Sequence, residues 1–159
     1  MKISKRGAGS AKHSSWKKGK FEITTDPSQI DLSVVHHFLT NCYWAKGVPA
    51  ETVRRSIQHS LCFGIYHGRQ QVGFARVITD QATFAYIGDV FVVELHRGKG
   101  LSKWLMQCIK SHPDLQGLRR WSLITRDAHG LYQQFGFTPL KSPQNWMEIH
   151  DAGVYERSN

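Results

Sequence analysis

Residues 89–102, DVFVVELHRGKGLS, decide the fold of this 159-residue chain. The apolar, β-branched residues at its start belong to a longer run over 83–93, which predicts a buried strand. After the two glycines, apolar residues recur at the spacing of a helix from Leu101 to Ile109. The stretch therefore predicts a strand that enters a helix through a glycine-rich turn.

The rest of the chain supplies a sheet for that strand. Upstream, the pattern predicts a strand at 21–24, helices at 34–39 and 49–60, and strands at 61–66 and 71–79. Downstream, it predicts a strand at 121–125, a short helix capped by Asp127 and ended by Gly136, and strands at 137–140 and 146–149. The order β-α-α-β-β-β-α-β-α-β-β indicates an α/β fold with a mixed sheet, in which strands 83–93 and 121–125 lie parallel.

The positive charge of the chain is concentrated at its N-terminal end. The chain has 21 Lys and Arg residues against 12 Asp and Glu residues, a formal net charge of +9. Seven of the basic residues lie in 1–20, which hold no acid, so residues 21–159 carry 14 basic against 12 acidic residues. We expect a basic, flexible arm over 1–20 and a single domain over 21–159. The nearly neutral domain argues against a nucleic-acid partner.

Composition also argues against a membrane protein and a disulfide-stabilised one. No apolar run approaches the ~20 residues that a membrane-spanning helix needs. The basic N-terminal end lacks the apolar stretch of roughly 7–15 residues found in a secretory signal. Three cysteines without C-x-x-C spacing argue against a disulfide framework, and nine histidines show no metal-ligand spacing. We therefore expect a cytoplasmic protein with no membrane segment and no metal.

The turn at 97–102 is the first candidate site. Glycines at a helix N-terminus leave backbone N–H groups free to bind a phosphate, and Arg97, Lys99 and Lys103 add positive charge. Neither the P-loop pattern nor the full dinucleotide fingerprint is present. On these residues alone, phosphate binding and a glycine turn that merely bends the chain both stay open.

The second candidate site is the short helix that carries Tyr132. A tyrosine near the carboxyl ends of parallel strands reaches the crevice where ligands bind in such sheets. Its hydroxyl, with an ordinary pKa of ~10, can act as an acid toward a departing thiolate of pKa ~8.5. Because Leu131 and Phe135 share its helix face, packing in the core is the alternative role.

Together these two segments resemble the GNAT acetyltransferase superfamily. The superfamily's pyrophosphate motif, [QR]-x-x-G-x-[GA], corresponds to residues 97–102, RGKGLS. Its C-terminal signature, Leu-Tyr followed three residues later by Gly-Phe, corresponds to residues 131–137. The predicted order of elements matches the GNAT fold over residues 21–150, so the resemblance covers nearly the whole chain outside the arm.

The resemblance implies a site for acetyl-CoA as co-substrate. Strands 83–93 and 121–125 would splay apart, and the pantothenate amides would pair with the exposed edge between them. The residues that the resemblance assigns to the cofactor are Val90, Phe91, Val92, Arg97, Gly98, Lys99, Gly100, Leu101, Ser102 and Lys103. Tyr132 would protonate the leaving thiolate, and no nucleophilic cysteine is required.

Two residues depart from the superfamily's pattern. Ser102 stands where the motif ends in Gly or Ala, which places a slightly larger side chain against the phosphate. Thr125 stands where many members carry an Asn that contacts the cofactor. Threonine keeps a hydrogen-bonding group but has less reach, so we expect Thr125 to contact the cofactor in an altered site.

Transfer to an amine also needs a base and an acceptor pocket. Asp89 and Glu94 are candidates for the base, and the alternative for Asp89 is an ion pair with Arg76. Tyr43 and Trp44 make the connection between the first two helices unusually aromatic, so they are candidates for the acceptor wall, with plain loop packing as the alternative. Arg76 is assigned to the same side. The weaker candidates are Asp80, Tyr86, Arg126 and Asp127.

The function that the resemblance implies is acetyl-CoA-dependent N-acetylation of a primary amine. The acceptor would be a small molecule or a peptide, and a homodimer is expected because dimers are frequent in the superfamily. The alternative is a protein of the same fold that binds CoA or acyl-CoA without catalysis and acts as a sensor.

Overall fold

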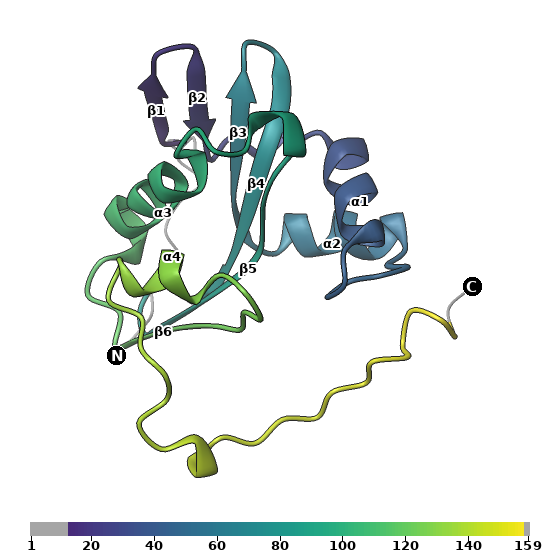
Figure 1. Cartoon of the computed structure of the whole chain (residues 1–159), viewed down its shortest axis with the longest axis vertical. Coiled ribbons are helices and arrows are strands. Elements are labelled where there is room, and N and C mark those ends of the chain that lie inside the picture. Colours follow the sequence, from purple (N-terminus) through teal and green to yellow (C-terminus); the bar gives the residue numbers. More distant parts are fainter. Residues whose placement is uncertain (1–12, 158–159) are drawn as a thin grey trace, which may run out of the picture.

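A six-stranded sheet with helices on both faces forms the body of the protein (Figure 1). The computed structural model describes residues 13–157. The strands are β1 (Ser15–Lys18), β2 (Phe21–Thr24), β3 (Leu61–His67), β4 (Gln70–Thr79), β5 (Phe84–Val92) and β6 (Arg120–Leu123). The α-helices are α1 (Leu32–Asn41), α2 (Ala50–Gln58), α3 (Leu101–Ser111) and α4 (His129–Gln133). Four 3-10 helices join them: η1 (Pro27–Gln29), η2 (Glu94–His96), η3 (Pro113–Leu115) and η4 (Pro143–Asn145).

The strands lie in chain order across the sheet. Neighbours from β1 to β5 are antiparallel, and β5 and β6 are parallel because α3 crosses over between them. This confirms the predicted α/β fold with one locally parallel pair. The strands and helices expected between residues 21 and 123 all form, with ends that differ by a few residues.

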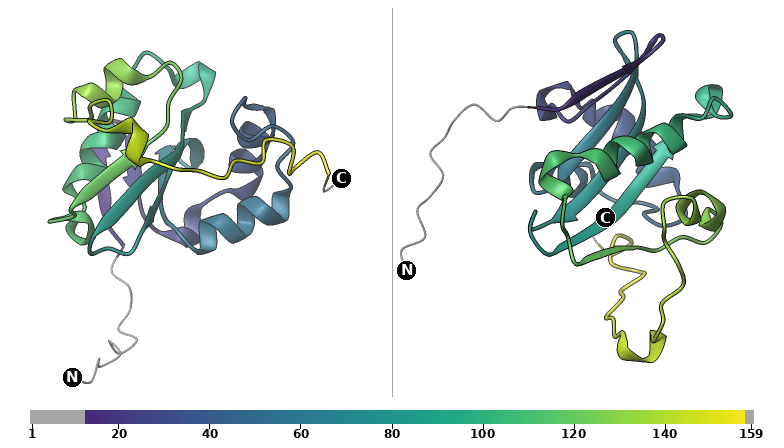
Figure 2. Two further views of the ribbon diagram at one scale, coloured as in Figure 1. Left: turned by 90° about the horizontal axis from the view of Figure 1, so that it is seen from below. Right: turned by 90° about the vertical axis from the view of Figure 1, so that its left-hand side faces the viewer.

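Helices cover both faces of the sheet (Figure 2), and each face has its own apolar core. On one face, α3 contributes Leu105 and Ile109, which pack with Phe63 and Ile65 of β3. On the other face, α1 and α2 cover a second cluster that includes Phe74 and Phe91. Because Phe91 belongs to the second cluster and its neighbour Val92 to the first, β5 is covered on both sides and its position is set from both.

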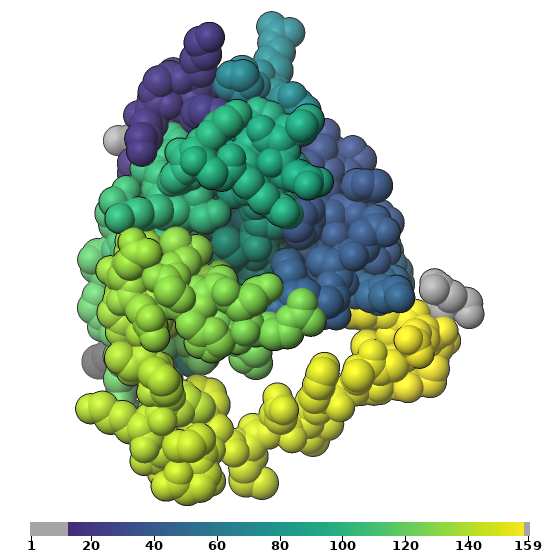
Figure 3. All heavy atoms as spheres, viewed as in Figure 1, coloured from purple at the N-terminus to yellow at the C-terminus, as the bar shows by residue number. Residues whose placement is uncertain are grey.

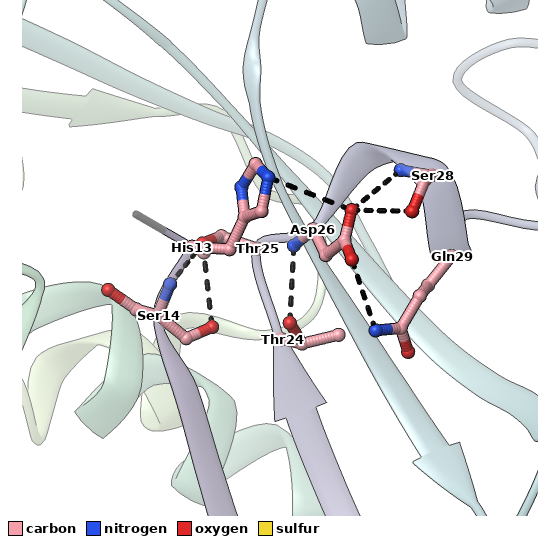
Figure 4. A network of polar contacts seen from close by, with 7 residues as sticks. All are labelled: His13, Ser14, Thr24, Thr25, Asp26, Ser28 and Gln29. Atoms are coloured by element: carbon pink, nitrogen blue, oxygen red, sulfur yellow. Dashed lines mark hydrogen bonds and ion pairs between the residues drawn. The ribbon is translucent and has the colours of Figure 1, made fainter. Parts of the chain in front are cut away.

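The N-terminal end corrects one expectation. The arm expected over 1–20 is too long, because β1 pairs with β2 along its whole length. Trp16 stacks on Phe63 with ring centroids 6.0 Å apart, so β1 partly buries an aromatic ring despite its lysines. Beside the strand, Ser14 and Thr25 exchange hydrogen bonds, and the carboxylate of Asp26 accepts hydrogen bonds from the residues that follow it (Figure 4). The remainder of the expected arm, residues 1–12, lies outside the described residues.

Helix α4 begins differently from the prediction. Its first turn is not capped by Asp127, since the N-cap residue is Ala128 and no side chain of that residue is available to cap. Instead, the hydroxyl of Thr125 accepts a hydrogen bond of 3.0 Å from the N–H of Ala128. Gly136 ends the helical segment at φ +85°, as expected for a glycine in the left-handed region.

The two strands expected near the C-terminus do not form. Residues 137–140 and 146–149 pair with no other strand in the described part of the chain. Met147 and Ile149 are 96% and 104% exposed, so the apolar side chains that suggested a strand are not buried. A strand needs a neighbour for its backbone hydrogen bonds, and the chain here runs away from the sheet instead (Figure 1).

Candidate functional site

The parallel pair of strands opens at its carboxyl end. β6 pairs with β5 only over Phe84–Ile87, while β5 continues to Val92 without a partner on that side. The pairing of β5 with β4 is also irregular, with a register shift between Phe74 and Arg76. Opposite this shift, Asp89 has φ +54°, which is uncommon for a residue with a side chain. The bulge and the early end of β6 together leave an open stretch of strand edge.

The glycine-rich turn lies directly beyond this open edge. Gly98 and Gly100 both have φ +73°, a conformation that costs most other residues energy, so the glycines are required by the backbone. Gly100 is the N-cap of α3 and brings no side chain to satisfy the helix's first N–H groups. The positive end of the helix dipole also points here. The turn therefore presents donors and a favourable potential to an anion.

A hollow of about 250 Å³ adjoins the turn. Most of the residues expected to bind the cofactor line it, namely Val92, Arg97, Gly98, Gly100, Leu101, Ser102 and Lys103, together with His96 and Leu131. Lys99 does not line it, and its ammonium group donates to the carbonyl of Leu95. Arg97 has a structural contact as well, because its Nε donates to the Val92 carbonyl at 3.0 Å. Backbone N–H groups at a helix start, with the two cations Arg97 and Lys103 beside them, are the kind of donor set that binds phosphate groups.

The side chains of Val90 and Phe91 on β5 pack into the two cores of the protein. The ring of Phe91 stacks on Phe38 of α1 with centroids 3.9 Å apart, on the face opposite α3. The side chain of Val90 packs against the core under α3. Their side chains are therefore occupied in the two cores, which leaves backbone groups as the part of this segment available to a ligand.

Tyr132 is buried at the side of the opening. Tyr132 is 8% exposed, and its ring packs against the Phe137 ring with centroids 5.9 Å apart. The pKa of Tyr132 is raised to about 12, mainly by burial and to a smaller extent by the nearby Tyr43 and Tyr86. The hydroxyl therefore keeps its proton at neutral pH and can donate a hydrogen bond. Tyr132 is both a core residue and a neighbour of the tyrosines on β5 and on the interhelix loop.

Asp89 joins the open strand edge to the interhelix loop. Its Oδ2 lies 2.6 Å from Nε of Arg76, and both side chains are largely buried, at 12% and 19% exposed. Its Oδ1 accepts a hydrogen bond of 3.3 Å from the indole N–H of Trp44. Of the two roles considered for Asp89, the ion pair with Arg76 is thus present. Both carboxylate oxygens are engaged, which makes Asp89 a better anchor than proton acceptor.

Tyr43 extends the same loop toward α4. The guanidinium of Arg126, in the connection between β6 and α4, lies 3.7 Å from the centroid of the Tyr43 ring. Tyr43 and Trp44 contact each other edge to face at 5.0 Å. Both are partly exposed, at 49% and 42%. The loop therefore spans the opening from β5 to the β6–α4 connection, with aromatic surface left for a ligand.

The other candidates have simpler roles. Asp80 accepts hydrogen bonds from the backbone of residues 82–84, and the hydroxyl and backbone of Thr83 do most to hold its pKa low. It closes the β4–β5 turn. Glu94 is exposed on η2. Thr125 caps α4, so its hydroxyl is engaged in the protein.

The thiols of the chain stay protonated, and the described residues contain no metal-binding cluster. Burial raises the pKa of the Cys62 and Cys108 thiols to about 12 and also raises that of Cys42, so all three stay protonated. Among residues 13–157, no three His, Cys, Asp or Glu side chains gather in a way that could hold a metal ion. No helix within the same residues has the length and apolar character to cross a membrane.

Sequence reasoning missed the contacts that assemble this side of the opening. The Trp44–Asp89 and Tyr43–Arg126 contacts join residues 45 and 83 positions apart, and no local pattern records such pairs. The sequence feature that pointed to this side of the opening was the pair of aromatic residues in the connection between α1 and α2. It identified Tyr43 and Trp44 but not their partners, Arg126 and Asp89.

Comparisons with known proteins support the observed fold. The model of the family described as "Acetyltransferase (GNAT) domain" matches residues 58–139. A candidate acetyltransferase of Gibberella zeae is 31% identical over 144 residues, covering 76% of this chain and 80% of that protein. A solved candidate acetyltransferase of the GNAT family from Xanthomonas campestris pv. campestris is 52% identical, with a TM-score of 0.84, and covers 87% of this chain and 99% of its own.

A more distant solved structure shares the fold. It is a predicted acetyltransferase of Clostridium acetobutylicum, solved with acetyl-CoA. It is 14% identical to this chain, with a TM-score of 0.57, and covers 82% of this chain and 94% of its own.

Proposed function

Because the chain belongs to the GNAT acetyltransferase family and is an acyltransferase, we propose that it transfers an acetyl group from acetyl-CoA to a primary amine. The amine belongs to a small molecule or a peptide that enters beside the interhelix loop. One observation carries this proposal: the open edge of β5 leads into the glycine-rich turn, and the hollow beside that turn is also lined by Leu131, the neighbour of Tyr132 on α4. The three free cysteines suit a reducing compartment, which supports a cytoplasmic location.

The residues of the turn would hold the cofactor's pyrophosphate. Backbone N–H groups of Leu101, Ser102 and Lys103 point outward at the start of α3, and the left-handed glycines allow close approach. The unpaired edge at residues 88–92 would add hydrogen bonds in the manner of an extra strand. Acetyl-CoA, when bound, supplies an acetyl thioester that an amine can attack.

Tyr132 provides the proton for the leaving sulfur. Its raised pKa keeps the hydroxyl protonated, so a donor is present at every pH near neutrality. A thiolate that forms beside it in a site closed to water gains most from a hydrogen bond of this kind. No cysteine takes part, because the thiols of the chain are protonated and buried or half-buried.

Asp89 holds the acceptor side in place. Its contacts with Arg76 and Trp44 tie the interhelix loop to the strand that presents the cofactor. We assign Tyr43 and Trp44 to the wall that contacts the acceptor and Arg76 to support of that wall. The acceptor attacks as the neutral amine, so the rate should rise with pH toward the amine's own pKa of ~8–10.

The proposal is tested by an acceptor screen that follows release of free thiol from acetyl-CoA. The panel should hold small amines, amino acids, aminoglycosides and peptides with a free N-terminus or lysine, and mass spectrometry should identify the acetylated product. Binding of acetyl-CoA is measured separately by calorimetry. Turnover with any amine above the rate of spontaneous hydrolysis supports the proposal.

The two measurements together separate the alternatives. Tight binding without turnover on the whole panel would favour a sensor that binds the cofactor and lacks catalysis. Absence of any binding by acetyl-CoA or CoA would overturn the assignment of the turn and the open edge. Turnover with an alcohol alone would overturn the assignment of an amine acceptor.

A further inference from the structure

Exposed apolar side chains gather on the acceptor side of the sheet, where β5 and β6 part. On β5, Ala85 and Ile87 lie in the core under α3, so alternation along the strand places Tyr86 and Gly88 on the opposite face. That face is covered by α1, α2 and the loop between them, whose buried residues belong to the second core. Tyr86 and Gly88 therefore face the side on which the interhelix loop lies.

Ile124 directly follows β6 and lies on the same face as Tyr86. Leu123 packs against the core under α3, so the alternation of the strand turns Ile124 to the opposite side. Ser122 is the register partner of Tyr86, and Ile124, two residues further on, comes level with Gly88. Ile124 is 79% exposed. It therefore adds exposed apolar surface next to the ring of Tyr86.

The half-buried ring of Tyr86 lies against the backbone of Gly88. A Cβ atom at position 88 would lie 3.3 Å from Cε1 of Tyr86, so the missing side chain leaves room for the ring. Burial, chiefly, and the nearby Asp89 raise the pKa of Tyr86, whereas Arg76 and a hydrogen bond with the backbone of Ile124 lower it. The side chain of Tyr86 thus runs along β5 toward the end of the strand. Its ring forms a floor between the ion pair and Ile124.

Aromatic rings of the interhelix loop stand beside this floor. Trp44 donates its indole N–H to Asp89, the carboxylate at one end of the floor. Tyr43 contacts Trp44 edge to face and holds the guanidinium of Arg126, which follows Ile124 by two residues. Figure 3 shows the light green connection between β6 and α4 against the blue surface of α1 and α2. These contacts bring the rings of the loop and Ile124 to the same opening.

The charges around this opening do not favour a polycation. The segments that form it carry three cations and two anions, which are Lys46, Arg76, Arg126, Asp89 and Asp127. The ion pair with Arg76 engages Asp89, which leaves one carboxylate, Asp127, beside the two other cations. A ligand with several positive charges would be repelled, whereas a ligand with a single ammonium group meets little net charge.

We propose that the acceptor is a primary amine with one ammonium group and an aromatic body, and that Ile124 is a specificity-determining residue for it. This inference rests on the proposed acetyl transfer to an amine. The aromatic body would lie on the ring of Tyr86 and against Ile124 and Trp44, so that binding removes exposed apolar surface from water. The amine nitrogen bonds to the acetyl carbon as the carbon–sulfur bond breaks. The proton that the nitrogen releases balances the one that the thiolate takes from Tyr132.

Steady-state kinetics with a series of amines tests the proposal. At saturating acetyl-CoA, kcat/KM for 2-phenylethylamine should exceed that for ethylamine at least about tenfold, because the phenyl ring is buried in the complex. The polycation spermidine should react no better than ethylamine. Equal values for the three amines, or a preference for spermidine, would overturn the aromatic class and leave the proposed function supported.

Ile124→Asn tests the specificity residue. The variant should lower kcat/KM for 2-phenylethylamine about tenfold and that for ethylamine less than about twofold, with an unchanged Kd for acetyl-CoA. Ile124→Leu keeps the apolar surface and should keep the preference. The matched control Ile149→Asn replaces an isoleucine that is 104% exposed in the C-terminal segment, and it should behave as the wild type. A loss that falls equally on both amines, or that appears as weaker binding of acetyl-CoA, would overturn the assignment of Ile124.

Calorimetry on the CoA-loaded protein separates this inference from the proposed function. 2-Phenylethylamine should bind at least about tenfold more tightly than ethylamine, and Ile124→Asn should remove the difference. If this holds and no amine is acetylated, the proposed function fails while the aromatic class stands. If hexanoyl-CoA binds more tightly than acetyl-CoA, Ile124→Asn abolishes that gain and the two amines bind equally, the apolar face belongs to the acyl chain and the proposal is overturned.

Discussion

The two halves of the candidate site are built in different ways. The proposed cofactor half consists of the turn at 97–103 and the open edge at 88–92, which present backbone groups. The acceptor half consists of Tyr43, Trp44, Arg76, Asp89 and Arg126, and it acts through side chains from four separate segments. The first half is continuous in sequence, whereas the second exists only after folding.

This difference indicates how each half can change. Backbone donors depend on the conformation of the chain, so side chains elsewhere in the turn can vary, while a substitution at Gly98 or Gly100 strains the backbone. Side chains that meet across distant segments can be replaced in pairs without disturbing the sheet. We therefore expect the cofactor to be set by the fold and the acceptor by residues at the loop. Tyr132 lies where the two halves meet.

The largest effect should follow from Tyr132→Phe. Turnover should fall roughly 10²–10⁴-fold, because the proton donor for the leaving thiolate is lost. The affinity for acetyl-CoA should stay within about twofold, since the phenyl ring keeps the packing against Phe137. Because the pKa of Tyr132 is raised to about 12, the wild-type rate should show no decline from this group below pH 10. Steady-state kinetics across pH measure the turnover and its pH dependence, and calorimetry measures the affinity for acetyl-CoA.

The control for this substitution is Tyr66→Phe. Tyr66 is also buried, and its hydroxyl donates to the Gln29 carbonyl at 2.8 Å. It lies on β3, which is separated from β6, the strand before α4, by β4 and β5. That variant should lose some stability, about 1 kcal/mol for the hydrogen bond, and keep its turnover. Equal turnover in the wild type and Tyr132→Phe would remove Tyr132 from the chemistry and leave it as a core residue.

The next largest effect should be confined to the cofactor half. Gly100→Ala forces a side chain into a left-handed conformation, which costs about 1–2 kcal/mol. Relief of that strain shifts the first N–H groups of α3, so the Kd for acetyl-CoA should rise about tenfold, while the KM for the acceptor stays nearly constant. Gly117→Ala is the matched control, since Gly117 has φ +72° and equal space around it but lies outside the turn.

Calorimetry with acetyl-CoA distinguishes the two glycine variants. Both should unfold at a lower temperature by a similar amount, because the strain is the same in each. A Kd that rises equally in both would mean that general destabilisation, and not the geometry of the turn, controls cofactor binding.

Asp89→Asn tests the acceptor half. Asparagine adopts positive φ at least as readily as aspartate, so the bulge should persist while the charge is lost. Weaker contacts with Arg76 and Trp44 should raise the KM for the acceptor about fivefold, because charged hydrogen bonds are roughly twice as strong as neutral ones. The rising limb of the pH–rate profile should remain. Loss of that limb, with a fall in kcat of a hundredfold or more, would instead identify Asp89 as the general base.

The same contrast explains how far the sequence could be interpreted. The turn and its helix were predictable because glycine conformation, helical spacing and charge all lie within a few consecutive residues. The sequence left two roles open for Asp89, general base or ion-pair partner. The choice depends on Arg76 and Trp44, which are distant from Asp89 in sequence. Local patterns report what a segment can do, and tertiary packing selects among the options.

The two ends of the chain show this limit most clearly. Residues 13–20 look like part of a basic tail, yet β2 offers them an edge and Phe63 offers Trp16 a ring to stack on. Residues 146–149 look like a strand, yet no edge in the described part of a single chain accepts them. In both cases the deciding factor was the presence of a neighbouring strand, which composition does not report.

The smallest expected effect concerns Arg126, which covers Tyr43 at the rim of the acceptor half. Arg126→Ala removes a cation–π contact worth about 0.5–1 kcal/mol at an exposed site, so the KM for the acceptor should rise about two- to fivefold. The control is Lys110→Ala on α3. It removes the cation–π contact between the Lys110 ammonium and the Trp121 ring, 4.2 Å from the ring centroid, and should leave the KM for the acceptor unchanged. If Arg126→Ala changes the Kd for acetyl-CoA as much as the KM for the acceptor, the two halves are coupled through Tyr43. The acceptor wall would then belong to the cofactor site as well.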